Sequence, residues 1–320
     1  FRFRSDTNSR HSLVSFLFIT FDPMRISLSR LSLIQLHLAV VLAGGSGLFA
    51  KCVAVGPVGI TCGRTLFGSL TLLVAATVMN SSLRLRSRRD LPMLAVSGAV
   101  LAVHWFAFFV SIQVSTVAIG MLAFSTFPLF VTFLEPLFFD ERLHRSDVVT
   151  ALVVVAGLIL VTPNWDMSHH LTQGVLWGVV SAFTYAVHSL MSRSYVRVYP
   201  AVTVAFYQQV FATLCVLPFA LRLEGIPSGV DSFLLIVLGV VFTGFAHGLT
   251  VASLRHLRAQ TVSVAFGLEP VYGILLAWLL LSEQPSARTL FGGVFILCAV
   301  VWASIRHRDS AFTRRGKRKA

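Results

Sequence analysis

Charged side chains inside long apolar segments are the residues of this sequence that could do chemistry. Arg64 and Glu269 lie within such segments, whereas Lys51 and Glu135 each lie near the end of one. A charge in the hydrocarbon core of a membrane is costly, so such residues usually bind a solute or an ion, or pair with one another. Lys51 and Arg64 could attract the carboxylate or phosphate of a metabolite, and we take both as candidate binding residues.

Glu269 is the candidate for a switchable negative charge. Pro270 follows it, and a proline removes one backbone donor and frees a carbonyl oxygen that could serve a polar ligand. A desolvated carboxyl group at this position could bind and release protons during a transport cycle. Two alternatives stay open: Glu269 could form a structural ion pair with Arg64 or Lys51, or these cations could reach the membrane interface.

Prolines indicate where the apolar segments bend or break. Pro128 and Pro270 lie inside two of these segments, and Glu135 with Pro136 stands near the end of the segment that contains Pro128. A proline interrupts the helical hydrogen-bond ladder. We therefore expect these four residues to break helices or to act in gating.

Other polar and aromatic side chains also lie at membrane depth. We expect some of them to line a solute pathway, although a hydrogen bond between helices is the simpler role of any single histidine. They are His104, Trp105, Tyr207, Gln208, His247 and Tyr272.

Enzymatic chemistry has little support. Ser46 in GGSG, Gly44 to Gly47, fits the short pattern of an intramembrane serine hydrolase, but no motif supplies a base or an oxyanion donor. The HExxH and GxxxxGK[ST] motifs do not occur, and the four cysteines lack the spacing of a zinc site. We predict that the protein is not an enzyme and has no catalytic residue, metal or cofactor.

The composition places the chain in a lipid bilayer. Of its 320 residues, 56% are hydrophobic and 12% are charged, and the mean hydropathy is +0.80. An ordinary soluble domain is far less apolar. The formal net charge is +13, but the basic residues form short clusters between apolar runs, so we do not expect nucleic acid as a partner.

Most of the apolar segments have the ~20 residues that a helix needs to cross a bilayer. Because their backbone groups find no water there, we expect helices. The ten predicted spans are residues 33–55, 58–79, 92–113, 116–139, 147–163, 172–192, 201–221, 232–254, 259–281 and 287–305. Residues 1–32 form a basic extension, predicted to be disordered or non-native before Met24, and residues 306–320 form a basic tail.

The basic residues predict the orientation. Of the 26 Lys and Arg residues, all but four fall in the terminal segments or in alternate connections between spans; the four are Lys51, Arg64, Arg222 and Arg288. Basic connections stay on the cytoplasmic side. Both termini are therefore predicted to be cytoplasmic.

An internal repeat organises the chain. Three residues recur after 142 positions, as Phe124 and Phe266, Pro128 and Pro270, and Glu141 and Glu283. We predict one repeat at 33–163, a second at 172–305, and an outer connector at 164–171. Five spans are an odd number, so the second repeat enters the membrane upside down. The predicted fold is an all-α membrane protein with ten transmembrane helices in two inverted five-helix repeats.

A family resemblance rests on these motifs. The segments PLFVTFLEPLFFDE and PVYGILLAWLLLSE each have a glutamate thirteen residues after a proline. The motif LEP spans Leu268 to Pro270. Lys51 and Arg64 lie in the first two predicted helices. With these features, over about residues 33–305, the chain resembles the EamA-type permeases of the drug/metabolite transporter superfamily. Glu135 and Gln284 depart from the usual pattern of that family, which weakens any transfer of substrate identity.

The resemblance implies a multi-pass exporter of the cell inner membrane. It would move a small metabolite, such as an amino acid or a derivative, by alternating access. We consider protons as the coupling ion and a homodimer as a possible assembly. The alternatives are an intramembrane serine hydrolase that uses Ser46 and a non-catalytic membrane scaffold.

Overall fold

The computed structural model describes residues 28–139, 143, 145–161, 169–257, 259–299 and 302. The predictions for the extension before residue 28, for most of the connector 164–171 and for the tail 306–320 lie outside the described residues. Glu141 lies outside them as well.

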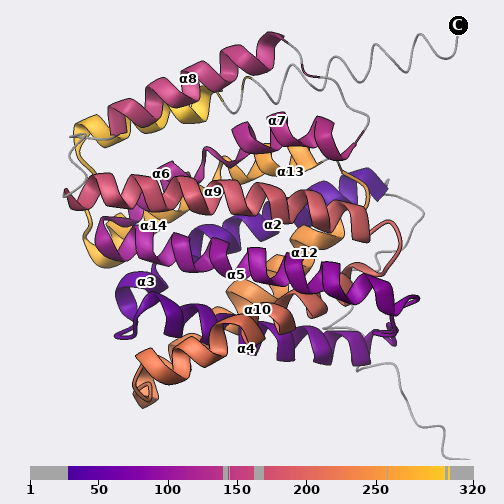
Figure 1. The fold of residues 1–320 in the computed structure, drawn as a ribbon. Coiled ribbons are helices and arrows are strands. Elements are labelled where there is room, and N and C mark those ends of the chain that lie inside the picture. Colours follow the sequence, from indigo (N-terminus) through magenta and orange to yellow (C-terminus); the bar gives the residue numbers. More distant parts are fainter. Residues whose placement is uncertain are drawn as a thin grey trace, which may run out of the picture.

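Within these ranges the regular elements are all helical, as predicted (Figure 1). They are α2 (Leu28–Ser46), α3 (Phe49–Cys52), α4 (Pro57–Val78), the 3-10 turn η1 (Arg88–Asp90), α5 (Leu91–Val114), α6 (Val117–Phe124), α7 (Phe127–Phe138), α8 (Arg145–Val161), α9 (His170–Tyr195), α10 (Ala201–Leu223), α11 (Gly229–Gly239), the π-helical η2 (Val240–Phe245), α12 (Ala246–Ser253), α13 (Ala259–Phe266) and α14 (Glu269–Leu281). A further helix covers Ala287–Ala299.

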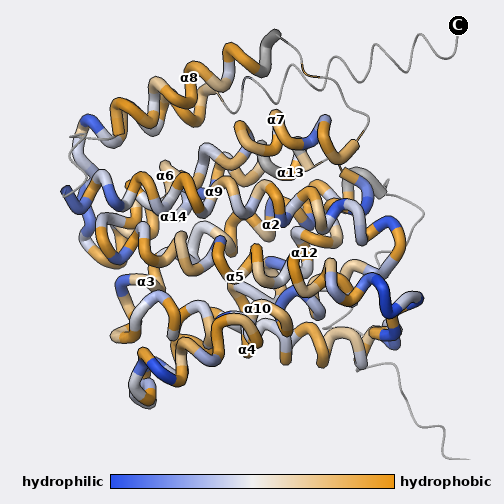
Figure 2. Tube along the Cα trace, in the orientation of Figure 1, coloured by the Kyte–Doolittle hydropathy of each residue, from blue (hydrophilic) through white to orange (hydrophobic). Residues whose placement is uncertain are grey.

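Apolar residues dominate the helices, and hydrophilic residues gather at the ends of the bundle (Figure 2). Among the described residues, seven helices are long and apolar enough to cross a membrane. They are Leu31–Cys52, Pro57–Val78, Arg88–Val114, Val117–Phe138, His170–Tyr195, Ala201–Leu223 and Gly229–Ser253. Three shorter apolar helices cover Val148–Val161, Glu269–Leu281 and Ala287–Ala299.

Three predicted continuous spans are divided. The segment 33–55 forms α2 and α3, 116–139 forms α6 and α7, and 259–281 forms α13 and α14. The last two breaks fall at the same place in their repeats. Pro128 and Pro270 lie in the first turn of α7 and α14, where a helix needs no proline N–H. The hydroxyl groups of Ser125 and Thr126 donate to carbonyls at the end of α6, at 2.6 and 2.8 Å. Pro136 lies inside α7 without dividing it.

The two predicted repeats pack against each other along the bundle. α5 packs along α9, α4 along α10, α2 along α12, and α7 along α13. The approach of α5 to α10 requires Gly98, because a Cβ atom there would lie 2.7 Å from the carbonyl oxygen of Gln208. Such small residues let membrane helices pack closely.

Hydrogen bonds join the repeats at the end of the bundle that carries Arg88 and Arg89, which we call the basic end. Tyr199 donates to the carboxylate of Asp90, and this bond raises the pKa of Tyr199 above its ordinary value. The hydroxyl group of Tyr207 donates to Leu83 O at 3.1 Å.

Carboxylates join the repeats at the opposite end. Glu224 accepts from the backbone N–H groups of Gly56 and Gly59, at 2.9 and 3.2 Å. Asp231 accepts from the N–H of Ala54 at 2.9 Å. These bonds fix the chain between α3 and α4.

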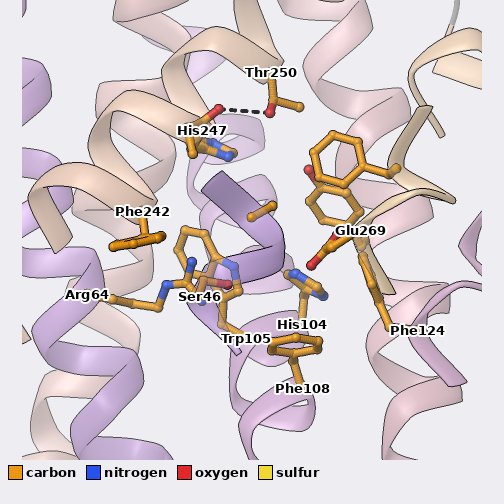
Figure 3. A pocket seen from close by; sticks show the side chains of 14 residues that line it. Ser46, Arg64, His104, Trp105, Phe108, Phe124, Phe242, His247, Thr250 and Glu269 are labelled. Atoms are coloured by element: carbon orange, nitrogen blue, oxygen red, sulfur yellow. Dashed lines mark hydrogen bonds between the residues drawn. The ribbon is translucent and has the colours of Figure 1, made fainter. Parts of the chain in front are cut away.

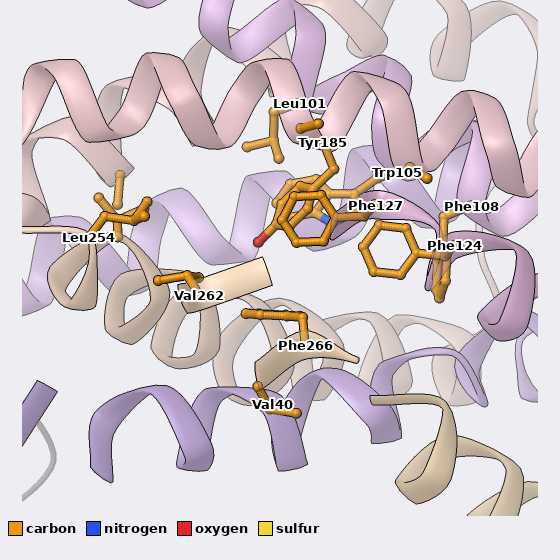
Figure 4. Packing of buried hydrophobic residues seen from close by; sticks show 14 of the residues in the cluster. Val40, Leu101, Trp105, Phe108, Phe124, Phe127, Tyr185, Leu254, Val262 and Phe266 are labelled. Atoms are coloured by element: carbon orange, nitrogen blue, oxygen red, sulfur yellow. The ribbon is translucent and has the colours of Figure 1, made fainter. Parts of the chain in front are cut away.

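The centre of the bundle is rich in aromatic rings from both predicted repeats (Figure 4). Phe127 stacks on Phe124 with 5.8 Å between centroids and meets the edge of Tyr185 at 4.9 Å. Phe266 lies 6.4 Å from Phe127. This aromatic cluster forms one wall of the cavity described next.

Candidate functional site

A small cavity of about 40 Å³ lies at the centre of the bundle. Helices from both predicted repeats contribute to its wall, and charged, imidazole and aromatic side chains face it (Figure 3). Its lining residues are Ala43, Ser46, Arg64, His104, Trp105, Phe108, Phe124, Tyr185, Phe242, Ala246, His247, Thr250, Phe266 and Glu269.

Arg64 supplies the positive charge of the cavity. Its side chain extends from α4, is 4% exposed, and donates from Nε to Thr243 Oγ1 at 3.1 Å. Its guanidinium lies 4.1 Å from the centroid of the Trp105 ring. Thr243 belongs to η2, and π-helical turns frequently occur at functional sites. The threonine and the indole hold the guanidinium in place without neutralising it.

Glu269 supplies the carboxyl group of the cavity. It begins α14, directly after the break in the helix, and it is 4% exposed. Its Oε2 atom has no hydrogen-bond partner among the described residues. Figure 3 shows Arg64 and Glu269 on opposite sides of the cavity, and no ion pair joins them in the described part of the chain. Opposite charges held apart in this way could receive a solute that carries both.

Two histidines complete the polar wall. His104 on α5 contacts Ser181 through Nδ1, at 3.0 Å from the carbonyl oxygen and 2.8 Å from the hydroxyl group. His247 on α12 meets Trp105 edge-on at 5.8 Å, and its Nε2 has no partner among the described residues.

The lining follows the internal repeat. Ten of the lining residues form pairs that stand 142 positions apart in the sequence. The pairs are Ala43 with Tyr185, His104 with Ala246, Trp105 with His247, Phe108 with Thr250, and Phe124 with Phe266. Arg64 and Glu269 break the pattern, because Phe206 and Phe127 stand at their equivalent positions. The two repeats therefore enclose one shared cavity, and Arg64 and Glu269 come from different copies.

The structure brings together only part of the predicted pathway. Arg64, His104, Trp105, His247 and Glu269 line the cavity, whereas Lys51, Tyr207, Gln208 and Tyr272 do not. Lys51 is exposed and donates from Nζ to the carbonyl oxygens of Gln113 and Ser115, at 3.4 and 2.9 Å. Tyr207 binds the chain at the basic end, and Gln208 lies in a second layer bonded to Ser97 and Ser192. The side chain of Tyr272 lies against Gly44.

Glu135 forms a buried ion pair outside the cavity. Arg193, near the end of α9, donates to its Oε1 atom, and the two side chains are 8% and 2% exposed, arginine first. The guanidinium of Arg193 also lies 4.2 Å from the ring of Phe139. Arg193 is the repeat equivalent of Lys51, since 142 positions separate them. The two cations thus have different anchors, a carboxylate in one case and backbone carbonyls in the other.

Two observations concern the enzymatic alternatives, the surroundings of Ser46 and the side chains that could bind a metal ion. Ser46 lines the cavity, but in the described part of the chain no histidine is hydrogen-bonded to it. Among the described residues, no group of three or more His, Cys, Asp or Glu side chains could hold a metal ion.

Phe124 and Phe266 of the aromatic wall were not among the predicted site residues. In the sequence they look like ordinary apolar helix residues. Their 142-residue equivalence to other wall residues was the signal that could have identified them. Gln209 is fully buried beside Gly68, and neither polar atom of its side chain has a partner among the described residues.

Comparison with known proteins gives consistent matches. The EamA-like transporter family matches twice, at residues 30–162 and 172–305. The pseudopaline exporter CntI of Pseudomonas aeruginosa is 29% identical over 232 residues, which cover 72% of this chain and 81% of the exporter. An uncharacterized transporter of Archaeoglobus fulgidus is 27% identical over 270 residues, covering 83% and 93% of the two chains. YxxF, an uncharacterized transporter of Bacillus subtilis, is 24% identical over 230 residues, covering 70% and 73%.

A solved crystal structure has the same fold. It aligns with a TM-score of 0.69 at 20% sequence identity, and the match covers 88% of this chain and 98% of the other. At this level of identity the likeness concerns the fold alone.

Proposed function

We propose that this chain, which belongs to the EamA-like transporter family, exports an amino acid or an amino-acid derivative through the central cavity. Arg64 would bind the anionic group of the solute and Glu269 its cationic or hydrogen-donating group. The observation that carries this proposal is one cavity, lined by equivalent residues of both repeats, with opposite charges on opposite sides. Its aromatic wall suits the apolar part of such a solute.

The proposed architecture is ten transmembrane helices in two inverted five-helix repeats, at 33–163 and 172–305. The seven long apolar helices and the three shorter ones stand where these spans are proposed. The helix breaks at equivalent places in the two repeats support the symmetry. We place the basic end and both termini in the cytoplasm, in a cell inner membrane, because basic segments stay on that side.

Transport would proceed by alternating access. The two repeats would rock about the cavity, with the Glu135–Arg193 pair closing the basic end and the Glu224 and Asp231 contacts closing the other. Pro128 and Pro270, beside the two helix breaks, would let α7 and α14 move relative to α6 and α13. Glu269 would couple the cycle to protons, binding one in one state and releasing it in the other.

A screen for ligands, followed by a transport assay, tests this proposal. The purified protein is heated with single amino acids, their derivatives and pseudopaline, and a compound that binds the folded state raises the melting temperature. A stabilising compound is then loaded into liposomes that contain the protein, and its efflux is measured. We expect efflux that Arg64→Gln abolishes. Efflux equal to that of protein-free liposomes for every stabilising compound would contradict the proposal.

Proton coupling has its own variant. Glu269→Gln keeps the size of the side chain but cannot exchange a proton, so we expect its residual transport to lose its dependence on pH. An unchanged rate and pH dependence would remove Glu269 as the coupling group. Ser46→Ala tests the hydrolase alternative, since it would abolish hydrolysis of a membrane substrate, whereas a transporter still moves its solute.

A further inference from the structure

A series of polar side chains leads from the cavity toward the basic end. His247 lines the cavity, and its ring centroid lies 5.4 Å from that of His188. His188 Nδ1 lies 3.2 Å from Ser97 O, and His188 Nε2 lies 3.3 Å from Ser192 Oγ. Gln208 Nε2 donates to both hydroxyl oxygens, of Ser97 and Ser192, at 2.8 Å. We call these five residues the polar relay.

The polar relay is buried but incompletely bonded. All five side chains are at most 5% exposed. Nevertheless, His247 Nε2 and Gln208 Oε1 have no hydrogen-bond partner among the described residues. A buried polar atom without a partner is costly, and such atoms usually bind water.

The polar relay ends close to the basic end. Ser192 lies in the last turn of α9, next to Arg193. Ser97 and Gln208 lie within the first three turns of α5 and α10, and these helices begin at the same end of the bundle. The hydrogen-bonded groups therefore extend from the central cavity to within a few turns of one membrane face.

The repeat shows that the other half of the bundle has no such series. At the equivalent positions, 142 residues away, His188, His247 and Ser192 are replaced by a serine, a tryptophan and an alanine. Gln208 and Ser97 are replaced by a leucine and a glycine. The five equivalents are Ser46, Trp105, Ala50, Leu66 and Gly239.

We propose that the polar relay conducts protons between Glu269 and the compartment at the basic end. This inference rests on the proposed proton coupling at Glu269. A hydronium ion at the basic end gives up one proton and becomes water. Ser192 Oγ passes its own proton to His188 Nε2 and takes up the incoming one; rotation of the His188 side chain then brings a ring N–H to His247 Nε2, which has no partner among the described residues, so that each imidazole returns to its neutral form. The proton finally converts the Glu269 carboxylate to a carboxylic acid, and release follows the reverse order.

Other ionisable groups face this route and are part of its electrostatics. Arg64 on α4 lines the same cavity as Glu269. His104 on α5 is held by Ser181 on α9, and Tyr185 on α9 stacks on His188 with 5.8 Å between ring centroids. Among the described residues of α10, Gln208 contributes an uncharged amide group to the polar relay.

The test follows protonation of Glu269 directly. Full-length protein in lipid nanodiscs is subjected to a rapid pH jump, and the infrared band of the protonated carboxyl group is recorded over time. The band that Glu269→Gln lacks belongs to this residue. His188→Asn keeps a donor for Ser97 O but cannot carry a proton, and we expect it to slow protonation by about tenfold or more, as for the loss of a general acid or base. Ser192→Ala should slow it less.

Control variants separate a relay from a structural role. Ser69→Ala removes another buried hydroxyl group, which bonds only its own helix at Leu66 O, and should leave the rate unchanged. In His188→Ala, added imidazole should restore the rate, which a purely structural histidine would not allow. An equal rate in the parent and His188→Asn, or slowing that imidazole does not reverse, overturns the relay alone. A parent band that does not respond to pH overturns the proposed coupling, and the relay with it.

Discussion

The Glu135–Arg193 pair gives the sharpest prediction about what holds the bundle together. Both side chains are almost fully buried, and they join α7 of the first repeat to α9 of the second. Removing one member of a buried pair leaves an unbalanced charge and costs about 3–5 kcal/mol. In Glu135→Leu the remaining guanidinium keeps its contact with Phe139, worth at most about 2 kcal/mol. Since that contact exists in the parent as well, it does not change the expected loss.

The two single variants should differ. Arginine cannot lose its proton, so Glu135→Leu leaves a permanent buried charge and should destabilise the protein by at least about 3 kcal/mol, or on the order of a hundredfold in the folding equilibrium. In Arg193→Leu the carboxyl group of Glu135 can take up a proton, and the loss should be smaller. The double variant leaves no charge behind, and it should be closer to the parent than Glu135→Leu is.

Reversible unfolding in mixed detergent micelles, followed by tryptophan fluorescence, measures the four proteins of this cycle. Arg197→Leu is the matched control, because Arg197 also lies near the ring of Phe139, at 5.0 Å, but is exposed. It should change stability by no more than about 0.5 kcal/mol. A double variant whose loss equals the sum of the single losses would refute the coupling between the two side chains.

Two further predictions concern the cavity and the basic end. Thr243→Val keeps the shape of the wall but removes the acceptor of Arg64 Nε, so ligand-induced stabilisation should weaken by about 1.5–3 kcal/mol in a thermal-shift titration; an unchanged affinity would show that Arg64 does not need this anchor. Tyr199→Phe tests a pH effect: the raised pKa of Tyr199 contributes stability below its ordinary value of 10.0, and this contribution is lost as pH rises through the folded pKa. The parent should therefore lose stability in alkaline solution more steeply than Tyr199→Phe in unfolding measured across that range, and parallel curves would contradict this assignment.

The helical spans and the two central charges could be predicted because each leaves a local signal. Apolar length predicts a span, and a charge within it predicts a functional position. Arg64 and Glu269 stood out for this reason, and the structure places both in one cavity. Lys51 gave a similar signal, but its position near a helix end lets it reach the carbonyl oxygens of Gln113 and Ser115 instead. Only the packing of the helices distinguishes these outcomes.

The helix breaks show why proline alone is an incomplete signal. Pro128 follows a break and Pro136 does not, although both lie in the same apolar segment. Before Pro128, the hydroxyl groups of Ser125 and Thr126 donate to carbonyl oxygens in the last turn of α6. A chain can end a helix inside a membrane only where such partners are present.

The cations Lys51 and Arg193 stand at equivalent positions of the two repeats. Arg193 pairs with a carboxylate of the other repeat, whereas Lys51 binds carbonyl oxygens at the opposite end. In the proposed cycle, the Arg193 pair helps to close the basic end, and the Glu224 and Asp231 contacts close the other. Single substitutions in one repeat can therefore change which side of the membrane is preferentially closed, without any change to the solute contacts at the centre.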